Sequence, residues 1–350
     1  MSKRIGILTG GGDAPGLNQV IRGVVYRGVE KYGFDFLAIE DGWKGLLEGI
    51  SHPLTIDDVR DWIYEGGSLL GSSRTNPFKH DGGGEKCREN FEKMELDVIV
   101  ALGGEDTLGV AYKLYSQFDI PTVGAPKTID NDLPGTDQCF GFDTAVNRVM
   151  EAFDRVRTTA RSHHRVIVVE VMGRHAGWMT LVGGVAGGAD IVLLPEEPFD
   201  INDVAEKLNK LKSQGRKYAL IAVSEGAKMK FADATDLITQ DAQVDEFGHV
   251  MLGGIGKVLA KELQKRTGWE ARHIVLGHLQ RGGAPSAFDR WFASRLGIAI
   301  ADQIAQDNYG VMLVLKGSDI VPVSLEEAAK GIRTVPENLI EIAKVFEPHL

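Results

Sequence analysis

The stretch ILTGGGDAPGLN, residues 7–18, runs from an apolar strand through a glycine-rich turn into a segment with the period of a helix. Such a strand–turn–helix unit directs free backbone amides toward an anion near the start of the helix. The stretch matches neither G-x-G-x-x-G nor the P-loop pattern, which ends in Lys followed by Ser or Thr. A lone turn of this kind can be purely structural, but ALGGEDTLG, residues 101–109, repeats the design and favours an anion-binding α/β protein.

Outward from these turns, short apolar runs alternate with longer segments of helical period, which is typical of doubly wound parallel sheets. The expected strands cover residues 4–9, 34–39, 97–102, 121–125, 165–171, 190–195, 218–225 and 273–278. The expected helices cover residues 16–31, 106–117, 142–161, 201–213, 250–267 and 285–306. The strands are too many for one sheet of ordinary size, so we expect two Rossmann-like, doubly wound domains rather than a single large sheet.

Composition limits the partners and the compartment. The 350 residues carry a formal net charge of −10, which argues against nucleic acid because binding to a phosphate backbone needs a concentrated basic face. The two cysteines, Cys87 and Cys139, indicate a reducing compartment without a disulfide framework. No run reaches the roughly 18 apolar residues of a membrane span, and no signal-like stretch precedes the first strand. We therefore expect a cytoplasmic protein with no membrane partner.

Acidic residues follow two of the predicted strands. Glu105 and Asp106 open the helix after the second glycine turn, where acids often only complement the helix dipole. TIDND, residues 128–132, sets Asp130 and Asp132 two apart, so that in an extended segment their side chains point the same way. They could then share a metal or divide the roles of base and ligand, although Asp-x-Asp pairs are also common in turns.

Basic residues border several strand ends and glycine turns. They are Lys127, Arg165, Arg174, Arg272, His278 and Arg281. Single arginines are usually solvated surface charges, but in an acidic protein this placement suggests cations gathered for a phosphate. Glu225 ends another predicted strand and could accept hydrogen bonds from sugar hydroxyls.

Together these segments resemble the phosphofructokinase family. The motifs GGGDAPGLN, GGED, PKTIDND, VEVMGRHAG and GHLQRGG occur in the family's order, and the likeness runs nearly end to end. The resemblance implies a two-lobed α/β enzyme that uses Mg²⁺ to move a phosphoryl group onto the 1-hydroxyl of fructose 6-phosphate. It also implies a homo-oligomer, dimer or tetramer, with active sites shared between subunits. The expected domains are residues 1–141 plus about 280–330 for the phosphoryl donor, and 142–279 plus about 331–350 for the sugar phosphate.

The resemblance further implies roles for individual residues. Asp130 would take the proton of the 1-hydroxyl, while Arg174 and Lys127 would act on the transferring group. The sugar phosphate would contact Thr128, Asp130, Met172, Gly173, Arg174, Glu225, His278 and Arg281, with Arg165 and Arg272 reaching it from a neighbouring subunit. The donor would contact Gly11, Gly12, Lys79, Gly104, Asp106 and Lys127, with Arg74 as a further candidate. Glu105 and Asp132 would hold Mg²⁺.

Two positions bear on the choice of donor. ATP-using relatives have glycines where this chain has Asp106 and Lys127, and this pair resembles the pyrophosphate-dependent branch of the family. A carboxylate about 4 Å from an ATP α-phosphate repels it by about 4 kcal/mol at an effective dielectric near 20, roughly a thousandfold in affinity. Pyrophosphate ends before that point, and the Lys127 ammonium can pair with its outer phosphate. We therefore expect reversible transfer from pyrophosphate.

The chain departs from the family's pattern at one metal-ligand position, and three competing functions remain open. Many relatives have Asp at the position of Glu105, and the longer side chain can serve Mg²⁺ directly or through water, which leaves Asp132 as the stronger ligand candidate. ATP could replace pyrophosphate on the same scaffold. The chain could also be an inert sugar-phosphate sensor, although intact Asp130 and Arg174 argue against this. A dinucleotide-dependent dehydrogenase is disfavoured because no G-x-G-x-x-G follows the first strand.

Overall fold

The larger sheet forms around β1 (Arg4–Thr9), which is buried along nearly its whole length. β1 pairs in parallel with β2 (Asp35–Ile39) and β4 (Val98–Gly103), and β4 pairs in parallel with β5 (Thr122–Pro126). This computed structural model describes residues 2–230 and 254–348, within which the strand order is β13-β12-β5-β4-β1-β2-β3. The outer strands are β3 (Ser51–Pro53), β12 (Val311–Lys316) and β13 (Asp319–Ser324), of which β3 and β13 run antiparallel to their neighbours.

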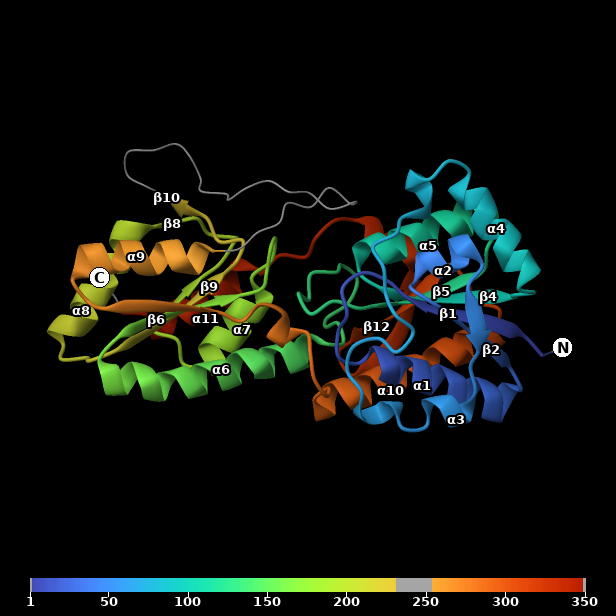
Figure 1. Cartoon of the computed structure of the whole chain (residues 1–350), viewed down its shortest axis with the longest axis horizontal. Coiled ribbons are helices and arrows are strands. Elements are labelled where there is room, and N and C mark those ends of the chain that lie inside the picture. The colour runs from blue at the N-terminus through green and yellow to red at the C-terminus, as the bar shows by residue number, and fades with distance from the viewer. Residues whose placement is uncertain (1, 231–253, 349–350) are drawn as a thin grey trace.

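Helices cover both faces of this sheet, so its central strands β1, β4 and β5 are buried along nearly their whole length rather than alternating. Ile5 and Ile7 of β1 join the core under α1 (Leu17–Arg27) and α10 (Ala287–Ala305), whereas Leu8 joins the core on the other face. That other face packs against α2 (Trp43–Glu48), α4 (Gly83–Lys93) and α5 (Glu105–Phe118), as Figure 1 shows. Full burial of each such side chain stabilises the fold by about 1.5–3 kcal/mol.

The smaller sheet has the order β11-β6-β9-β7, and all its described strands are parallel. They are β6 (Val166–Val171), β7 (Ile191–Leu193), β9 (Ala219–Ser224) and β11 (Ala271–Val275). One face packs against α6 (Phe142–His163), α7 (Trp178–Ala186) and α11 (Glu337–Phe346), and the other against α8 (Ile201–Ser213) and α9 (Ile255–Thr267). A short ribbon of β8 (Phe199–Asp200) and β10 (Met229–Lys230) adjoins this lobe (Figure 1).

Two doubly wound lobes therefore lie side by side, a larger and a smaller one, and the predicted fold class is confirmed (Figure 1). Several predicted boundaries differ. The helix predicted over 16–31 covers Leu17–Arg27 and is followed by a π-helix, η1 (Gly28–Tyr32), and the strand predicted over 190–195 covers only Ile191–Leu193. The strand predicted over 273–278 covers Ala271–Val275, because the chain then enters a 3-10 helix, η4 (Gly277–Gln280). The helix predicted over 250–267 has its first turn, residues 250–253, outside the described residues. The domain bounds stay a prediction.

Some elements escaped prediction because their sequences lack a clear period. α7 has the sequence WMTLVGGVA and is apolar on nearly every side, although only part of it is buried against the smaller sheet and α6 and Val182 is exposed. Its glycines resembled a turn rather than a helix. The β12–β13 hairpin was also missed, since β13 is a partly exposed edge strand with little hydrophobic alternation.

Two further properties of the described residues concern membrane spans and the thiols. Within them, no helix combines the length and the hydropathy needed to cross a membrane. Cys87 and Cys139 are both free and both buried. Burial raises the pKa of the Cys87 thiol to about 12 and raises that of Cys139 as well.

Helix α10 joins the helix layers of the two lobes. It approaches α1 so closely that a methyl group at Gly23 would lie 2.7 Å from the carbonyl oxygen of Ser294. In its first turn, the buried Asp289 carboxylate accepts hydrogen bonds from the N–H groups of Gly141 and Thr144, at 3.0 and 2.8 Å, and from the Thr144 hydroxyl. Because Gly141 and Thr144 begin α6, a single carboxylate ties the larger lobe to the smaller one.

Asp289→Ala should lower the free energy of unfolding by about 2–4 kcal/mol, because it leaves buried donors without an acceptor. Urea denaturation followed by far-UV circular dichroism measures the change. Asp137→Ala is the matched control: the exposed Asp137 carboxylate also joins distant segments, accepting from the Gly317 N–H at 2.7 Å and from Lys316 at 3.2 Å. Loss of the Asp137 carboxylate should lower the free energy of unfolding by less than about 1 kcal/mol. Equal losses in the two variants would contradict the role given to Asp289.

Candidate active site

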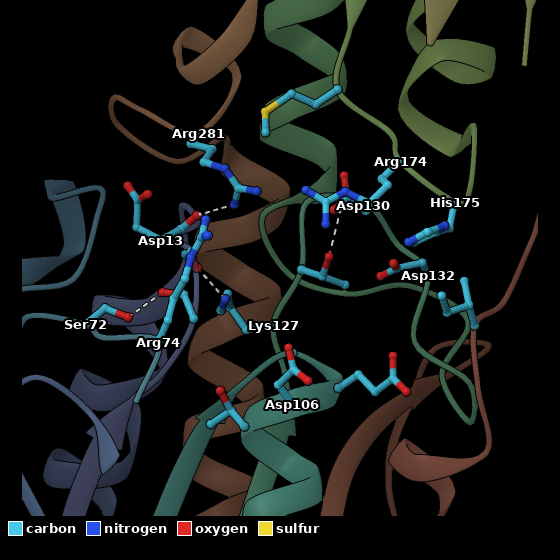
Figure 2. Close-up of a pocket in the computed structure, with 18 of the residues that line it drawn as sticks. Asp13, Ser72, Arg74, Asp106, Lys127, Asp130, Asp132, Arg174, His175 and Arg281 are labelled. Atoms are coloured by element: carbon cyan, nitrogen blue, oxygen red, sulfur yellow. Dashed lines mark hydrogen bonds between the residues drawn. The ribbon is translucent and has the colours of Figure 1, made fainter. Parts of the chain in front are cut away.

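A cavity of about 570 Å³ lies where strands of both sheets end. Its walls come from the segments that follow β1, β4, β5, β6, β9 and β11, and Figure 2 shows their side chains converging. Ile332, between the 3-10 helix η5 (Leu325–Ala329) and α11, adds a further wall. Both the size and the position beyond the carboxyl ends of parallel strands are typical of small-molecule sites.

Most of the predicted site residues line this cavity, and they come from both lobes. They are Gly11, Gly12, Gly104, Glu105, Asp106, Lys127, Thr128, Asp130, Asp132, Met172, Arg174, Glu225, His278 and Arg281. Gly173 lies in the chain between two of them, and its carbonyl accepts a hydrogen bond from the Ser224 hydroxyl at 2.6 Å. Arg74, the further donor candidate, lines the cavity as well.

Arg165, Arg272 and Lys79 lie outside the cavity lining. Arg165 precedes β6 and Arg272 is the second residue of β11, so both lie at the amino ends of strands whose carboxyl ends form the cavity. Both pair with Glu270, Arg165 at 3.0 Å. Lys79 ends the short 3-10 helix η3 (Pro77–Lys79). Within the described part of a single chain, these three cations are not brought into the site.

The first glycine turn is held from two sides. Gly11 has a φ of 77°, and its carbonyl accepts a hydrogen bond from the Ser72 hydroxyl. On the other side, Nη1 of Arg281 donates to the Asp13 carbonyl at 3.1 Å (Figure 2), and a methyl group at Gly12 would lie 2.7 Å from this nitrogen. The guanidinium predicted for the sugar 6-phosphate therefore contacts the turn predicted for the donor, so Arg281 borders both parts of the cavity.

Lys127 points toward the same turn. Its side chain is only 4% exposed, and Nζ donates to the Gly12 carbonyl (Figure 2). Burial, together with the Arg281 charge, lowers the pKa of this ammonium to about 8, against the opposing effect of nearby carboxylates. Lys127 therefore still carries its charge at neutral pH, in a cavity that Asp106 also lines.

The turn of residues 128–132 carries the two central acids. Asn131 has a φ of 54°, so the prediction of an extended segment is wrong at this point. Asn tolerates left-handed backbone because its side chain can bond locally, and here Oδ1 accepts from the Cys139 N–H at 2.9 Å. Asp130 and Asp132 nevertheless both line the cavity, because the bend is made at the residue between them.

Burial raises the pKa of both acids. For Asp130, the positive charges of Arg281, Lys127 and Arg174 oppose this rise. The pKa of Asp132 reaches about 7, because the charge of Asp130 adds to the effect of burial. Asp130 Oδ1 is buried and has no hydrogen-bond partner among the described residues. This oxygen is therefore available to accept a proton from a ligand hydroxyl.

The wall from the smaller lobe is fixed at the ends of β6 and β9. The Glu225 N–H donates to the last residue of β6 at 2.8 Å, which holds the two strand ends together. Arg174 extends from this wall toward Asp130 (Figure 2). Burial, together with the Asp130 charge, raises the pKa of Glu225 to about 7. Glu225 can thus both donate and accept hydrogen bonds near neutral pH.

The carboxylates offer ligands for a divalent cation without forming a closed cage. In the described ranges, no group of three or more His, Cys, Asp or Glu side chains could hold a metal ion by itself. Asp132 lies within electrostatic reach of Asp130 and Glu105, since both raise its pKa. Mg²⁺ usually takes one or two carboxylates together with substrate phosphates, so this set fits Mg²⁺ that binds along with a phosphate ligand.

Several further residues of the lining had no role predicted from the sequence. They are Asp13, Ser72, Ser73, Thr107, His175 and Ile332. Asp13 and His175 lie inside the motifs GGGDAPGLN and VEVMGRHAG. Their position next to predicted site residues was therefore the signal that could have identified them. Ile332 comes from a distant segment without a motif, and only the folded chain brings it to the site.

Comparison with known proteins identifies one family from both sequence and structure. The model of the family described as Phosphofructokinase matches residues 4–304. The chain is 51% identical to the pyrophosphate–fructose 6-phosphate 1-phosphotransferase of Amycolatopsis methanolica, over 98% of this chain and 99% of that protein. It is 46% identical to ATP-dependent 6-phosphofructokinase 3 of Streptomyces coelicolor, over 95% of this chain and 97% of that protein.

Among solved structures, Pichia pastoris phosphofructokinase in the T-state matches with a TM-score of 0.81 at 30% identity. The match covers 99% of this chain but only 39% of the Pichia chain. The family model and the near-full-length relatives agree with the arrangement of the five motifs around one cavity. The chain belongs to the phosphofructokinase family.

Proposed function

We propose that the chain catalyses reversible, Mg²⁺-dependent transfer of a phosphoryl group from pyrophosphate to the 1-hydroxyl of fructose 6-phosphate. The products are fructose 1,6-bisphosphate and phosphate, a step of glycolysis or gluconeogenesis. The observation that carries the proposal is the buried Lys127 ammonium, which lies against the first glycine turn in a cavity that also contains Asp106 and Asp130. The name of the Amycolatopsis methanolica relative supports the same reaction.

Asp130 is the proposed base. Its Oδ1 lacks a partner among the described residues, and burial raises its pKa above that of an ordinary carboxylate, which makes it a better proton acceptor. As the proton moves to Asp130, the sugar oxygen bonds to the transferring phosphorus and the bond to the leaving phosphate breaks. Arg174 and Lys127 stabilise the negative charge of the transferring group from opposite walls.

The wall from the smaller lobe would bind the sugar phosphate. Met172, Gly173 and Glu225 would contact the sugar and Thr128 the reacting end, while His278 and Arg281 would bind the 6-phosphate. Glu225, with a pKa of about 7, suits hydroxyls that both donate and accept hydrogen bonds. Since Arg281 also contacts the first glycine turn, its charge would act on both substrates.

The larger lobe would bind pyrophosphate and Mg²⁺. Amides of Gly11, Gly12 and Gly104 would face its phosphates, with Lys127 as the fixed cation and Asp106 excluding a longer donor. Asp132 and Glu105 would hold Mg²⁺ directly or through water. The bound ion would neutralise charge on the phosphates during transfer.

The assembly is proposed to be a cytoplasmic homo-oligomer whose active sites are shared between subunits. Arg165 and Arg272 support this, because they lie outside the cavity of their own chain at the opposite end of the smaller sheet. An arginine placed there can serve a phosphate only in another subunit. Lys79 would be an outer contact of the donor.

The first prediction concerns the donor. At equal concentrations of pyrophosphate and ATP, kcat/KM for fructose 1,6-bisphosphate formation should be higher with pyrophosphate. Asp106→Gly combined with Lys127→Gly should raise the ratio of ATP to pyrophosphate use by up to about a thousandfold, because it removes the repulsive and the attractive charge together. The KM for fructose 6-phosphate serves as the internal control and should change little. A wild-type preference for ATP would overturn the donor assignment.

The second prediction concerns the base. Asp130→Ser should lower kcat by about 10²–10⁴-fold, the usual contribution of a general base, while the Kd for fructose 6-phosphate changes little. Stopped assays and isothermal titration calorimetry measure the two quantities. Near-normal turnover in this variant would show that another group takes the proton.

The same variant tests the shared site. Arg272→Ala should also be weakly active by itself, since its arginine serves the neighbouring site. Mixed oligomers of Asp130→Ser and Arg272→Ala subunits should regain activity, because one site then has both Asp130 and the partner arginine intact. If mixed, co-refolded subunits are no more active than the two separate variants, this form of sharing is excluded.

A further prediction concerns pH. Burial lowers the pKa of Lys127 to about 8, so the ammonium loses its charge as the pH rises through 8. We expect kcat/KM for pyrophosphate, which reports the free enzyme, to fall on the alkaline side with an apparent pKa near 8. Lys127→Arg keeps its charge in this range and should lack the fall. An identical alkaline limb in Lys127→Arg would assign the titration to another group.

A further inference from the structure

Arg333 lies between η5 and α11 and contacts the turn that carries the two central acids. Nη2 and Nε of its guanidinium donate to the Asn131 carbonyl at 2.8 and 3.2 Å. Its own backbone N–H donates to the Asp132 carbonyl at 2.7 Å. Arg333 is not part of the cavity lining, although the preceding Ile332 is. The side chain therefore holds the turn from behind and does not face a ligand.

The same residue is bound on its other side by α7. The guanidinium carbon lies 4.5 Å from the centroid of the Trp178 ring, and the Trp178 indole N–H donates to the Arg333 carbonyl at 2.9 Å. Trp178 is buried, begins α7, and follows Arg174 by four residues in the chain. Arg333 thus connects the turn of Asp130, which follows β5 in the larger lobe, to the segment of Arg174, which follows β6 in the smaller lobe.

The turn is held from two sides. Asn131 adopts left-handed backbone, with a φ of 54°, a conformation that is uncommon for residues other than glycine and that Asn tolerates through local bonds of its side chain. Its side chain bonds to the Cys139 N–H, so one side of the turn is fixed from within the larger lobe. The carbonyl groups on the other side have Arg333 as their donor. A planar guanidinium can donate twice to one carbonyl while it stacks on an indole, which a lysine cannot do.

We propose that Arg333 is a positioning residue for phosphoryl transfer, which fixes the Asn131 turn relative to Arg174 so that Asp130 and Arg174 reach the transferring group together. This inference rests on the proposed function of the cavity. Its physical basis is the strong dependence of such transfer on alignment, where a displacement of about 1 Å can cost about 100-fold in rate. Substrate binding depends on other residues and would be largely retained.

Steady-state kinetics of Arg333→Ala tests the proposal. We expect kcat to fall by about 100-fold, whereas the KM values for fructose 6-phosphate and pyrophosphate stay within about twofold. Guanidinium chloride at a non-denaturing concentration should restore part of kcat in Arg333→Ala, because the free ion can occupy the vacated place. Arg333→Lys should stay impaired, since its ammonium cannot stack and donate in the same way. A merely structural loss would not respond to guanidinium.

Arg88→Ala is the matched control. Nη1 of Arg88 also donates to two main-chain carbonyls, those of Phe118 at 3.2 Å and Asp119 at 2.7 Å, and its guanidinium lies 5.7 Å from the Phe91 ring. It does not line the cavity. Loss of this arginine should leave kcat unchanged and should not respond to guanidinium.

Hydrogen–deuterium exchange separates failure of this inference from failure of the proposed function. Without substrates, residues 128–140 should exchange faster in Arg333→Ala than in wild type or Arg88→Ala. If wild type transfers no phosphoryl group from pyrophosphate, the proposed function falls, and unchanged exchange in Arg333→Ala would overturn the support of the turn as well. If wild type is active, a normal kcat in Arg333→Ala, or a loss that guanidinium does not relieve, overturns the positioning role.

Discussion

The site depends on the balance of positive and negative charges around one cavity that both lobes line. Asp130, Asp132 and Glu225 have their pKa values raised by burial, and the Asp130 charge raises the other two further. An isolated ion in such a place costs several kcal/mol, so the acids require cations beside them. Lys127 comes from the larger lobe and Arg174 from the smaller one, which means that the electrostatics are complete only when both lobes enclose the cavity.

Because both lobes must enclose the cavity, the connections that hold them together matter for the site. Asp289 ties α10 to the start of α6, on the helical side of the molecule, and Arg333 ties the Asn131 turn to Trp178 beside the cavity. Both use a charged group to bind main-chain donors or acceptors that would otherwise be unpaired at the junction. The lobes are therefore joined by directional bonds, which define their relative placement more narrowly than apolar contact alone would.

The elements that could be predicted from the sequence are those whose local pattern has a local physical cause. The apolar runs that became β1, β4 and β6 end in glycine or acidic segments, and their carboxyl ends necessarily meet in a doubly wound fold, so the motifs located the cavity walls. Other features could not be predicted, because their cause lies in residues far away in the sequence. The bend at Asn131 is held by bonds to Cys139 and Arg333, and α7 is apolar even at its exposed positions, such as Val182, so it has no helical hydrophobic period. Ile332 and Arg333 reach the site only through the return of the chain after η5.

The burial of both thiols has a practical consequence for measuring motions of the two lobes by fluorescence. Cys87 and Cys139 are buried, and their raised pKa values keep them as unreactive thiols at neutral pH. Maleimide dyes should therefore bypass the native cysteines and label only cysteines introduced on the surface. One such cysteine on each lobe would give a pair of fluorophores on an otherwise natural chain, whose energy transfer reports the separation of the lobes during turnover.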